Sequence, residues 1–262
     1  MTTGDPLDTV VERLRAAGCV WAEDEAALLE AAATDTDDAL ETLVARRVAG
    51  EPLETVLGWV EFLGRRLVVA SGVFVPRRRT ELLARTAIAE VARRRAPVVV
   101  EMCCGVAPVA GSVEDAGELH VADLDETALA CARLNAPSAA VHEGDLYDAL
   151  PGGVRGRVDV LVANAPYVPT GRIADMPPEA RDHEPRVALD GGPDGIDLHR
   201  RLAAGAGAWL VPGGVLLIET GPSQAGATTA AMAAAGLTTR VVEDDEIGGC
   251  VAVGLSPGAV RA

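Results

Sequence analysis

The stretch that decides the fold is Val98-Val99-Val100-Glu101-Met102, followed by the turn Cys103-Cys104-Gly105-Val106-Ala107-Pro108. A short apolar run bounded by Gly and Pro is typical of a strand buried on both faces of a parallel sheet. A glycine turn after such a strand lets the backbone approach a nucleotide-like ligand and aims N–H groups at its anionic part. Only Gly105 supplies that freedom and Pro108 removes one donor, so the turn alone is weak evidence for a ligand.

Similar apolar runs recur at residues 119–122, 158–163 and 215–219, separated by helical or Gly/Pro-rich segments. A helix is expected over residues 81–94, before the first strand. Short apolar strands that alternate with helices predict an α/β fold with a doubly wound, mostly parallel sheet. Such sheets bind ligands at the carboxyl ends of their strands, so the residues that follow each strand are where chemistry is expected.

The N-terminal part of the chain has a different pattern. Residues 6–50 carry apolar side chains at spacings of three and four, with acids on the other faces, which predicts a small helical unit. Residues 60–69 form two short extended runs around Gly64, which predicts a β-hairpin. We therefore expect a helical domain at 1–56, a linker with the hairpin at 57–75 and the α/β domain at 76–262.

Acidic residues follow the next two strands of the expected sheet. Asp123 comes about 20 residues after the glycine turn, where an acid accepts hydrogen bonds from ribose hydroxyls in dinucleotide-binding folds. Asp123 or Asp125 can instead cap the helix of residues 126–135; we assign the cap to Asp125, which leaves Asp123 to face the ligand. Asp145 falls where the third strand should end and would accept from the exocyclic amino group of adenine.

The sharpest local motif is Asn164-Ala165-Pro166-Tyr167, directly after the apolar run 158–163. Alkylation of an amide or amine nitrogen requires acceptors that hold its N–H groups and orient its electron density. Asn164 offers a side-chain oxygen and Ala165 a carbonyl, while Pro166 stiffens the turn and Tyr167 gives a flat wall for a planar substrate. The alternative is an ordinary turn with a packed tyrosine.

Composition excludes several classes of function. The 262 residues include 39 acidic and 23 basic ones, a net charge of -16, which repels nucleic-acid backbones and disfavours DNA as a partner. The cluster Arg77-Arg78-Arg79 could still make local anion contacts. No signal peptide or membrane span is evident, so we expect a cytoplasmic protein with no membrane partner. The spacings of cysteines and histidines predict neither disulfides nor a metal site, and His183 lies nearest the expected site.

Several motifs, in order and at matching separations, resemble the HemK/PrmC family. This family methylates the side-chain amide of the Gln in the Gly-Gly-Gln loop of peptide-chain release factors. The resemblance covers nearly the whole chain, and its motifs lie at residues 51–62, 75–81, 164–167, 183–192 and 209–214, with Glu219 after them.

The resemblance implies S-adenosylmethionine as cofactor and a Rossmann-like class I methyltransferase domain behind a helical substrate-recognition domain. The partner would be a release factor. The expected catalysis is mainly orientation of the acceptor nitrogen toward the methyl group. The residues that would bind the cofactor are Arg77, Thr80, Glu101, Gly105, Asp123, Asp145 and Asn164. Those that would position the acceptor are Asn164, Pro166 and Tyr167.

The chain departs from the family pattern at the cofactor turn, where Ala107 replaces the second glycine of Asp-x-Gly/Cys-x-Gly-Ser/Thr-Gly. If the backbone needs a positive φ there, alanine costs on the order of 1 kcal/mol and its methyl crowds the ligand. Residues 111–117 are small and acidic, so the following helix is expected to be short. In the acceptor motif, Ala165 replaces the first proline, which is a milder change.

Two acceptor classes therefore stay open: a release-factor glutamine, and an amide or amine nitrogen of a small molecule. A third reading, from another functional class, is a pseudo-methyltransferase or repurposed protein that has weakened or lost S-adenosylmethionine binding. DNA adenine methylation uses a similar acceptor motif but is disfavoured by the charge of -16 and by the absence of a target-recognition domain.

Overall fold

The computed structural model of the chain describes residues 6–35 and 39–258. Its centre is a seven-stranded sheet with the strand order β5-β4-β3-β6-β7-β9-β8. Strands β3 to β7 run parallel, whereas β9 is antiparallel to both of its neighbours. The strands are β3 (Val98–Met102), β4 (Glu118–Asp123), β5 (Ala140–Glu143), β6 (Val158–Ala163), β7 (Leu210–Glu219), β8 (Thr238–Asp244) and β9 (Gly249–Leu255).

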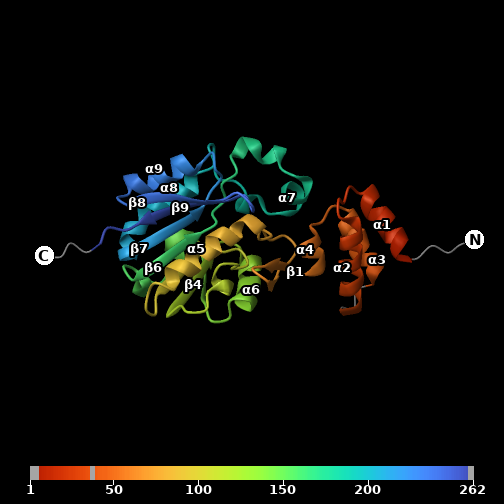
Figure 1. The fold of residues 1–262 in the computed structure, drawn as a ribbon, viewed down its shortest axis with the longest axis horizontal. Coiled ribbons are helices and arrows are strands. Elements are labelled where there is room, and N and C mark those ends of the chain that lie inside the picture. The colour runs from red at the N-terminus through yellow and green to blue at the C-terminus, as the bar shows by residue number, and fades with distance from the viewer. Residues whose placement is uncertain (1–5, 36–38, 259–262) are drawn as a thin grey trace, which may run out of the picture.

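Helices cover both faces of this sheet (Figure 1). One face packs against α5 (Glu81–Val91) and α6 (Glu126–Asn135), and the other against α8 (Asp197–Trp209) and α9 (Ala225–Ala234). Alternate strand residues serve the two faces, because successive side chains of a strand point in opposite directions. Val160 lies in the first core and Leu161 in the second. The predicted α/β, doubly wound and mostly parallel architecture is confirmed.

The connection from β3 to β4 contains only a 3-10 turn, Ala110–Ser112, where doubly wound folds usually place a crossover helix. The expectation of a short helix after the cofactor turn is thus confirmed in an extreme form. Gly111 and Gly117 allow the close passage, since a Cβ at Gly111 would meet the Asn135 carbonyl oxygen at 2.9 Å and one at Gly117 would clash with the backbone of Ala96. The short connection therefore joins these two neighbouring strands without a helical layer of its own.

The N-terminal helices have a small core of their own, formed by residues such as Leu14, Leu29 and Val44. These helices are α1 (Pro6–Ala16), α2 (Ala22–Asp35), α3 (Leu40–Val48) and α4 (Leu53–Leu57). The expected hairpin follows as β1 (Trp59–Phe62) and β2 (Arg65–Val68), paired antiparallel. Phe62 and Leu67 of the hairpin are buried in the core beneath α5 and α6. The division at 56/57 and 75/76 remains a prediction.

A segment after β6 crosses over the carboxyl ends of the strands and carries α7 (Pro178–His183). We call residues 169–189 the cover segment; it also contains the 3-10 turns Thr170–Asp175 and Arg186–Ala188. Figure 1 shows α7 between the sheet and the N-terminal helices. Arg47 of α3 connects the N-terminal helices to α7. Its Nη1 lies 2.6 Å from Glu179 Oε1 of α7, and its Nε lies 2.6 Å from Glu25 Oε2 of α2.

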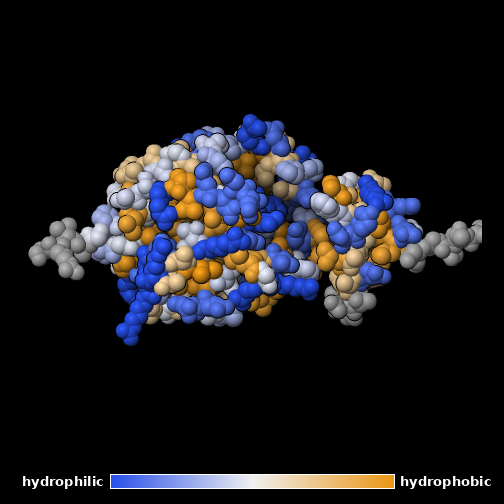
Figure 2. All heavy atoms as spheres, viewed as in Figure 1, coloured by the Kyte–Doolittle hydropathy of each residue, from blue (hydrophilic) through white to orange (hydrophobic). Residues whose placement is uncertain are grey.

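The remaining short turns are 3-10 helices at Arg78–Thr80, Leu146–Ala149 and Gly152–Val154. On the face shown in Figure 2, hydrophilic and hydrophobic residues are interspersed over both the sheet-containing part and the N-terminal helices. Within residues 6–35 and 39–258, no helix is long and apolar enough to cross a membrane.

Candidate active site

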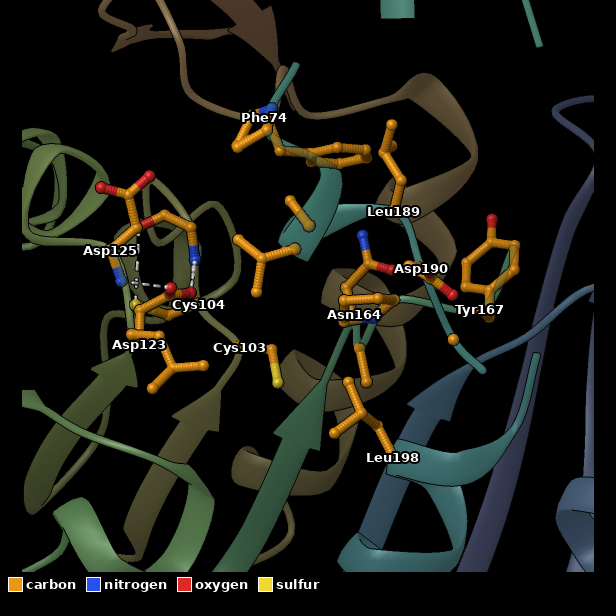
Figure 3. Close-up of a pocket in the computed structure, with 18 of the residues that line it drawn as sticks. Phe74, Cys103, Cys104, Asp123, Asp125, Asn164, Tyr167, Leu189, Asp190 and Leu198 are labelled. Atoms are coloured by element: carbon orange, nitrogen blue, oxygen red, sulfur yellow. Dashed lines mark hydrogen bonds between the residues drawn. The ribbon is translucent and has the colours of Figure 1, made fainter. Parts of the chain in front are cut away.

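A cavity of about 780 Å³ opens at the carboxyl ends of β3, β4 and β6, where the sequence placed the chemistry. Residues 74–79 and the cover segment form its other walls. In Figure 3, Asp123 and Asp125 lie on one side, Asn164 and Tyr167 on the other, and Cys103 between them. All expected site residues except Thr80 line this cavity: Arg77, Glu101, Gly105, Asp123, Asp145, Asn164, Pro166 and Tyr167.

The turn after β3 has the conformation expected for a glycine turn, although it contains one glycine. Cys103, Gly105 and Ala107 have φ values of 50°, 52° and 60°. The expected positive φ at Ala107 is therefore present, and its strain is borne by an alanine. The expected crowding of the ligand is wrong: Ala107 is fully buried in the core under α5 and α6 and does not line the cavity. The turn thus keeps an open cavity despite the lost glycine.

Glu101 holds the far end of this turn. Its carboxylate accepts hydrogen bonds from the backbone N–H groups of Ala110, at 2.6 Å, and Val109, at 3.2 Å. Burial raises the pKa of Glu101 to about 8, against the lowering effect of these two bonds. Glu101 is 3% exposed, so its main contact is with the turn and only its edge borders the cavity.

Asp123 joins the ends of β3 and β4. Its Oδ2 accepts from Gly105 N at 2.8 Å and its Oδ1 from Asp125 N at 3.0 Å. Burial raises the pKa of Asp123, while the backbone N–H groups lower it. Asp125 caps α6, accepting from Thr127 N and Ala128 N, so the predicted division of labour between the two acids matches the geometry.

Asp145 stands at the mouth of the cavity, two residues after the end of β5. Its Oδ2 accepts a hydrogen bond from Arg201 Nη2 of α8 at 2.8 Å. Arg201 also lines the cavity, but no local motif indicates it, because α8 follows much later in the chain. This ion pair marks the cavity wall beyond Asp123, where the adenine of a nucleoside was expected.

Asn164 is held from below by Thr80. Its Nδ2 lies 3.4 Å from Thr80 Oγ1, a long hydrogen bond that turns the side-chain oxygen toward the cavity. Thr80 is fully buried and does not line the cavity, so it supports Asn164 and does not face a ligand. Among the described residues, no partner is recorded for Asn164 Oδ1. The amide oxygen is therefore available to an acceptor N–H group.

Tyr167 is fixed by a network that its neighbours in sequence do not reveal. Its hydroxyl oxygen accepts from Arg79 Nε at 2.8 Å and donates to Glu219 Oε1 at 3.2 Å. Glu219 ends β7 and is 1% exposed. Burial and the nearby Glu219 raise the pKa of Tyr167 to about 12, so the phenol is neutral at physiological pH. The ring is thus a rigid, uncharged wall beside Asn164.

Arg77 ties the turn before α5 to the cover segment. Its Nη2 donates to Glu184 Oε1 at 2.5 Å, and the same oxygen accepts from Val75 N at 3.1 Å. The Arg77 guanidinium also stacks over Phe74, with 5.1 Å to the ring centroid. Phe74 lines the cavity and was not singled out from the sequence. The ion pair therefore links the turn before α5 to the cover segment at this wall of the cavity.

The histidine nearest the site is His199, in place of the expected His183. His199 is fully buried, its Nδ1 lies 2.9 Å from Thr228 Oγ1, and its ring centroid lies 6.4 Å from that of Tyr167. Burial lowers its pKa to about 4, although the Ala165 carbonyl raises it, so the ring is neutral. In the described parts of the chain, no group of three or more His, Cys, Asp or Glu side chains could hold a metal ion.

Comparison with known proteins identifies relatives, although no family model matches the chain. A release factor glutamine methyltransferase of Streptomyces coelicolor is 38% identical over 191 residues, covering 70% of this chain and 68% of that protein. One from Cereibacter sphaeroides is 34% identical over 271 residues, covering 94% of this chain and 95% of that protein. The chain belongs to the HemK/PrmC family.

Another relative in this comparison has a different acceptor in its name. The 4-amino-L-phenylalanine/4-methylamino-L-phenylalanine methyltransferase of Streptomyces pristinaespiralis is 38% identical over 203 residues, covering 74% of this chain and 69% of that protein. Among solved structures, Methanocaldococcus jannaschii Trm5 in complex with adenosine shares the fold, with a TM-score of 0.50, 13% identity and coverage of 77% of this chain and 56% of that one.

Membership of the HemK/PrmC family confirms the predicted enzyme class, an S-adenosylmethionine-dependent N-methyltransferase. The alternative of a family member without methyl transfer is not favoured, since the relatives are named methyltransferases. The cavity fits the cofactor on this chain's own geometry, because the altered turn keeps its positive φ angles while the Ala107 methyl stays out of the cavity.

Proposed function

We propose that this enzyme methylates a side-chain amide nitrogen of a protein glutamine, with a release factor as the first acceptor to test. The proposal is supported by the alignment with the Cereibacter sphaeroides release factor glutamine methyltransferase, which extends through the N-terminal helices. We also propose that the helical domain, residues 1–56, recognises the protein substrate. Arg47 and Glu179 link it to the segment that covers the cavity.

The observation that carries the proposal is the orientation of Asn164. Thr80 binds its Nδ2, so Oδ1 is directed to an acceptor N–H. The adjacent Ala165 carbonyl, which borders His199, would supply a second acceptor through its remaining lone pair. Two acceptors on one planar nitrogen fix both its position and the direction of its electron density. Tyr167 then forms the wall against which a planar amide or aniline lies.

The cofactor would be held by the opposite side of the cavity. Asp123 would accept from the ribose, Asp145 from the adenine amino group, and the turn at Gly105 would approach the nucleoside closely. Bound S-adenosylmethionine supplies an electrophilic methyl group. The chain's own contribution is to orient the acceptor and to exclude water on the side covered by Phe74 and Arg77, the latter held in place by Glu184.

A small aromatic amine is the second candidate acceptor. It is favoured by the similarity to the Streptomyces pristinaespiralis enzyme and by the flat wall of Tyr167, which suits an aniline as well as an amide. Both acceptors require the same arrangement of Asn164 and Ala165.

The test is transfer of a labelled methyl group from S-adenosylmethionine to intact release factor, to a Gly-Gly-Gln peptide and to 4-amino-L-phenylalanine. Peptide mapping by mass spectrometry would locate the methyl group. We expect a methylated nitrogen that depends on Asn164, with Asn164→Ala losing activity and Asn164→Asp, which retains an oxygen, losing less. No methylated product with any of the three acceptors would contradict the proposal.

A further inference from the structure

The guanidinium of Arg79 is only partly used by the protein. Its Nε donates to Tyr167 Oη and lies 3.3 Å from Glu219 Oε1. Neither of its two terminal nitrogens has a hydrogen-bond or ion-pair partner among residues 6–35 and 39–258. The side chain is 40% exposed and lines the cavity. Arg79 therefore brings to the cavity wall a permanent cation with four N–H donors that no described residue uses.

The other arginines of the cavity are engaged differently. Arg77 pairs with Glu184, Arg186 with Asp190 and Arg201 with Asp145. In each of these pairs a terminal nitrogen contacts the carboxylate. Arg79 is the cavity arginine whose carboxylate contact runs through Nε, so that the planar fork of its terminal nitrogens is left for another group. A bidentate fork is the geometry that a carboxylate matches best.

The position of Arg79 along the acceptor wall specifies which group it meets. The Tyr167 ring extends from the backbone beside Asn164 to a hydroxyl that contacts Arg79. An acceptor whose nitrogen is bound at Asn164 and whose plane lies along the Tyr167 ring therefore brings its far end to Arg79. The protein has a net charge of -16, so an anionic acceptor needs such a local cation to enter.

We propose that Arg79 binds a carboxylate at the far end of a small acceptor, so that among small amines and amides the enzyme prefers those that carry a free carboxylate, such as an amino acid. This inference rests on the proposed orientation of the acceptor nitrogen at Asn164, and it defines the chemistry of the second, small-molecule candidate acceptor. Arg79 is thereby a specificity-determining residue to which the resemblance to the family assigned no role.

The test compares two acceptors that differ only at the far end: 4-amino-L-phenylalanine and its carboxamide. Steady-state kinetics would give kcat and KM for each, with the wild type, Arg79→Gln and Arg79→Lys. A charge-assisted bidentate contact predicts a KM about tenfold or more lower for the acid than for the amide. The ratio should fall toward one in Arg79→Gln and take an intermediate value in Arg79→Lys.

Two control variants separate recognition of the acceptor's charge by Arg79 from the structural support that Arg79 gives to Tyr167. Arg78→Gln changes an exposed neighbour that does not line the cavity, and the preference for the acid should be unchanged. Tyr167→Phe removes the hydroxyl that Arg79 contacts but retains the cation, so turnover should fall while the preference for the acid persists.

Equal KM values for acid and amide in the wild type, or a preference that survives in Arg79→Gln, would overturn the inference. If neither compound is methylated, calorimetric titration of both into the protein loaded with S-adenosylhomocysteine decides it: the acid must bind more tightly than the amide in the wild type and equally in Arg79→Gln. Failure of the proposed function is distinguishable, since it would be the absence of transfer to every acceptor, release factor included.

Discussion

Asp123 Oδ2 accepts a hydrogen bond from Gly105 N at 2.8 Å, which joins the end of β4 to the turn after β3. The second end of that turn is held by Glu101 through Val109 N and Ala110 N. Two carboxyl groups, the buried Glu101 and the half-buried Asp123, thus impose the turn geometry that a second glycine would otherwise permit. This explains how the chain keeps a cofactor cavity with Ala107 in a left-handed conformation.

Ala107→Gly should leave the affinity for S-adenosylhomocysteine within about threefold of the wild type, because the methyl group lies in the core and not in the cavity. Relief of the positive φ is worth about 1 kcal/mol, and loss of the buried methyl costs about as much, so the free energy of unfolding should change little. Calorimetry and chemical denaturation would measure the two quantities.

The matched control is Ala96→Gly, at an exposed residue with a φ of 47°. Here no methyl burial is lost, and the substitution should stabilise the protein by about 1 kcal/mol. A large gain in cofactor affinity for Ala107→Gly would show instead that its methyl crowds the ligand.

Glu101 should make stability depend on pH. Burial raises its pKa from 4.5 to about 8, so the folded state holds the proton more tightly than the unfolded chain. Its contribution is fully present below about pH 4.5 and is lost as the pH rises through about 8. Across this window the wild type should lose up to about 1.4 kcal/mol per pH unit relative to Glu101→Gln.

Denaturation at a series of pH values would measure this slope, with Glu114→Gln as a control at an exposed carboxylate. The other buried carboxylates are common to all three proteins and cancel in the comparison. Identical slopes for the wild type and Glu101→Gln would refute the assignment.

The fold was predictable where local patterns are strong. Continuous apolar runs indicated β3, β4, β6 and β7, since a parallel strand is buried on both faces. The terminal pair β8 and β9 was not anticipated: β8 lies at the sheet edge with polar residues at most positions, so it lacks an apolar run. The helix expected over 81–94 ends at Val91, because the chain must leave the helical conformation before Pro97, and Ala96 has a positive φ of 47°.

The candidate site was predictable only in part, for a related reason. Asp123, Asp145 and Asn164 each follow a strand, so topology alone brings them to one sheet edge. The contacts of Arg79 with Tyr167 and Glu219 join three distant segments, and no spacing in the sequence encodes them. The direction of the Ala107 methyl likewise depends on the backbone conformation of the turn.

Asn164→Ala should reduce kcat by about 100-fold or more while leaving the affinity for S-adenosylhomocysteine nearly unchanged. The expected loss reflects the acceptor nitrogen, which is no longer held in line with the methyl group. Steady-state kinetics together with cofactor titration would separate the two effects. Equal losses in turnover and in cofactor binding would instead assign Asn164 to the cofactor alone.

Arg47→Met should destabilise the protein by about 3 kcal/mol, because it leaves the buried Glu25 carboxylate without its partner. It should also raise amide hydrogen exchange in α7, which Arg47 contacts through Glu179. The control Arg13→Met removes an exposed ion pair with Glu41 and should cost less than about 1 kcal/mol. Unchanged exchange in α7 would show that the N-terminal helices do not support the cover segment.

The most direct test of the account is calorimetric titration of S-adenosylhomocysteine and S-adenosylmethionine into the wild type, Asp123→Ala and Asp125→Ala. Asp123 and Asp125 both line the cavity, but Asp123 fixes the altered turn through Gly105 N, whereas the Asp125 carboxylate caps α6. We predict saturable micromolar binding in the wild type, its loss in Asp123→Ala, and retention in Asp125→Ala with a stability loss of about 1 kcal/mol. Absence of binding in a folded wild-type protein would contradict the claim that the altered turn after β3 still forms a working cofactor site.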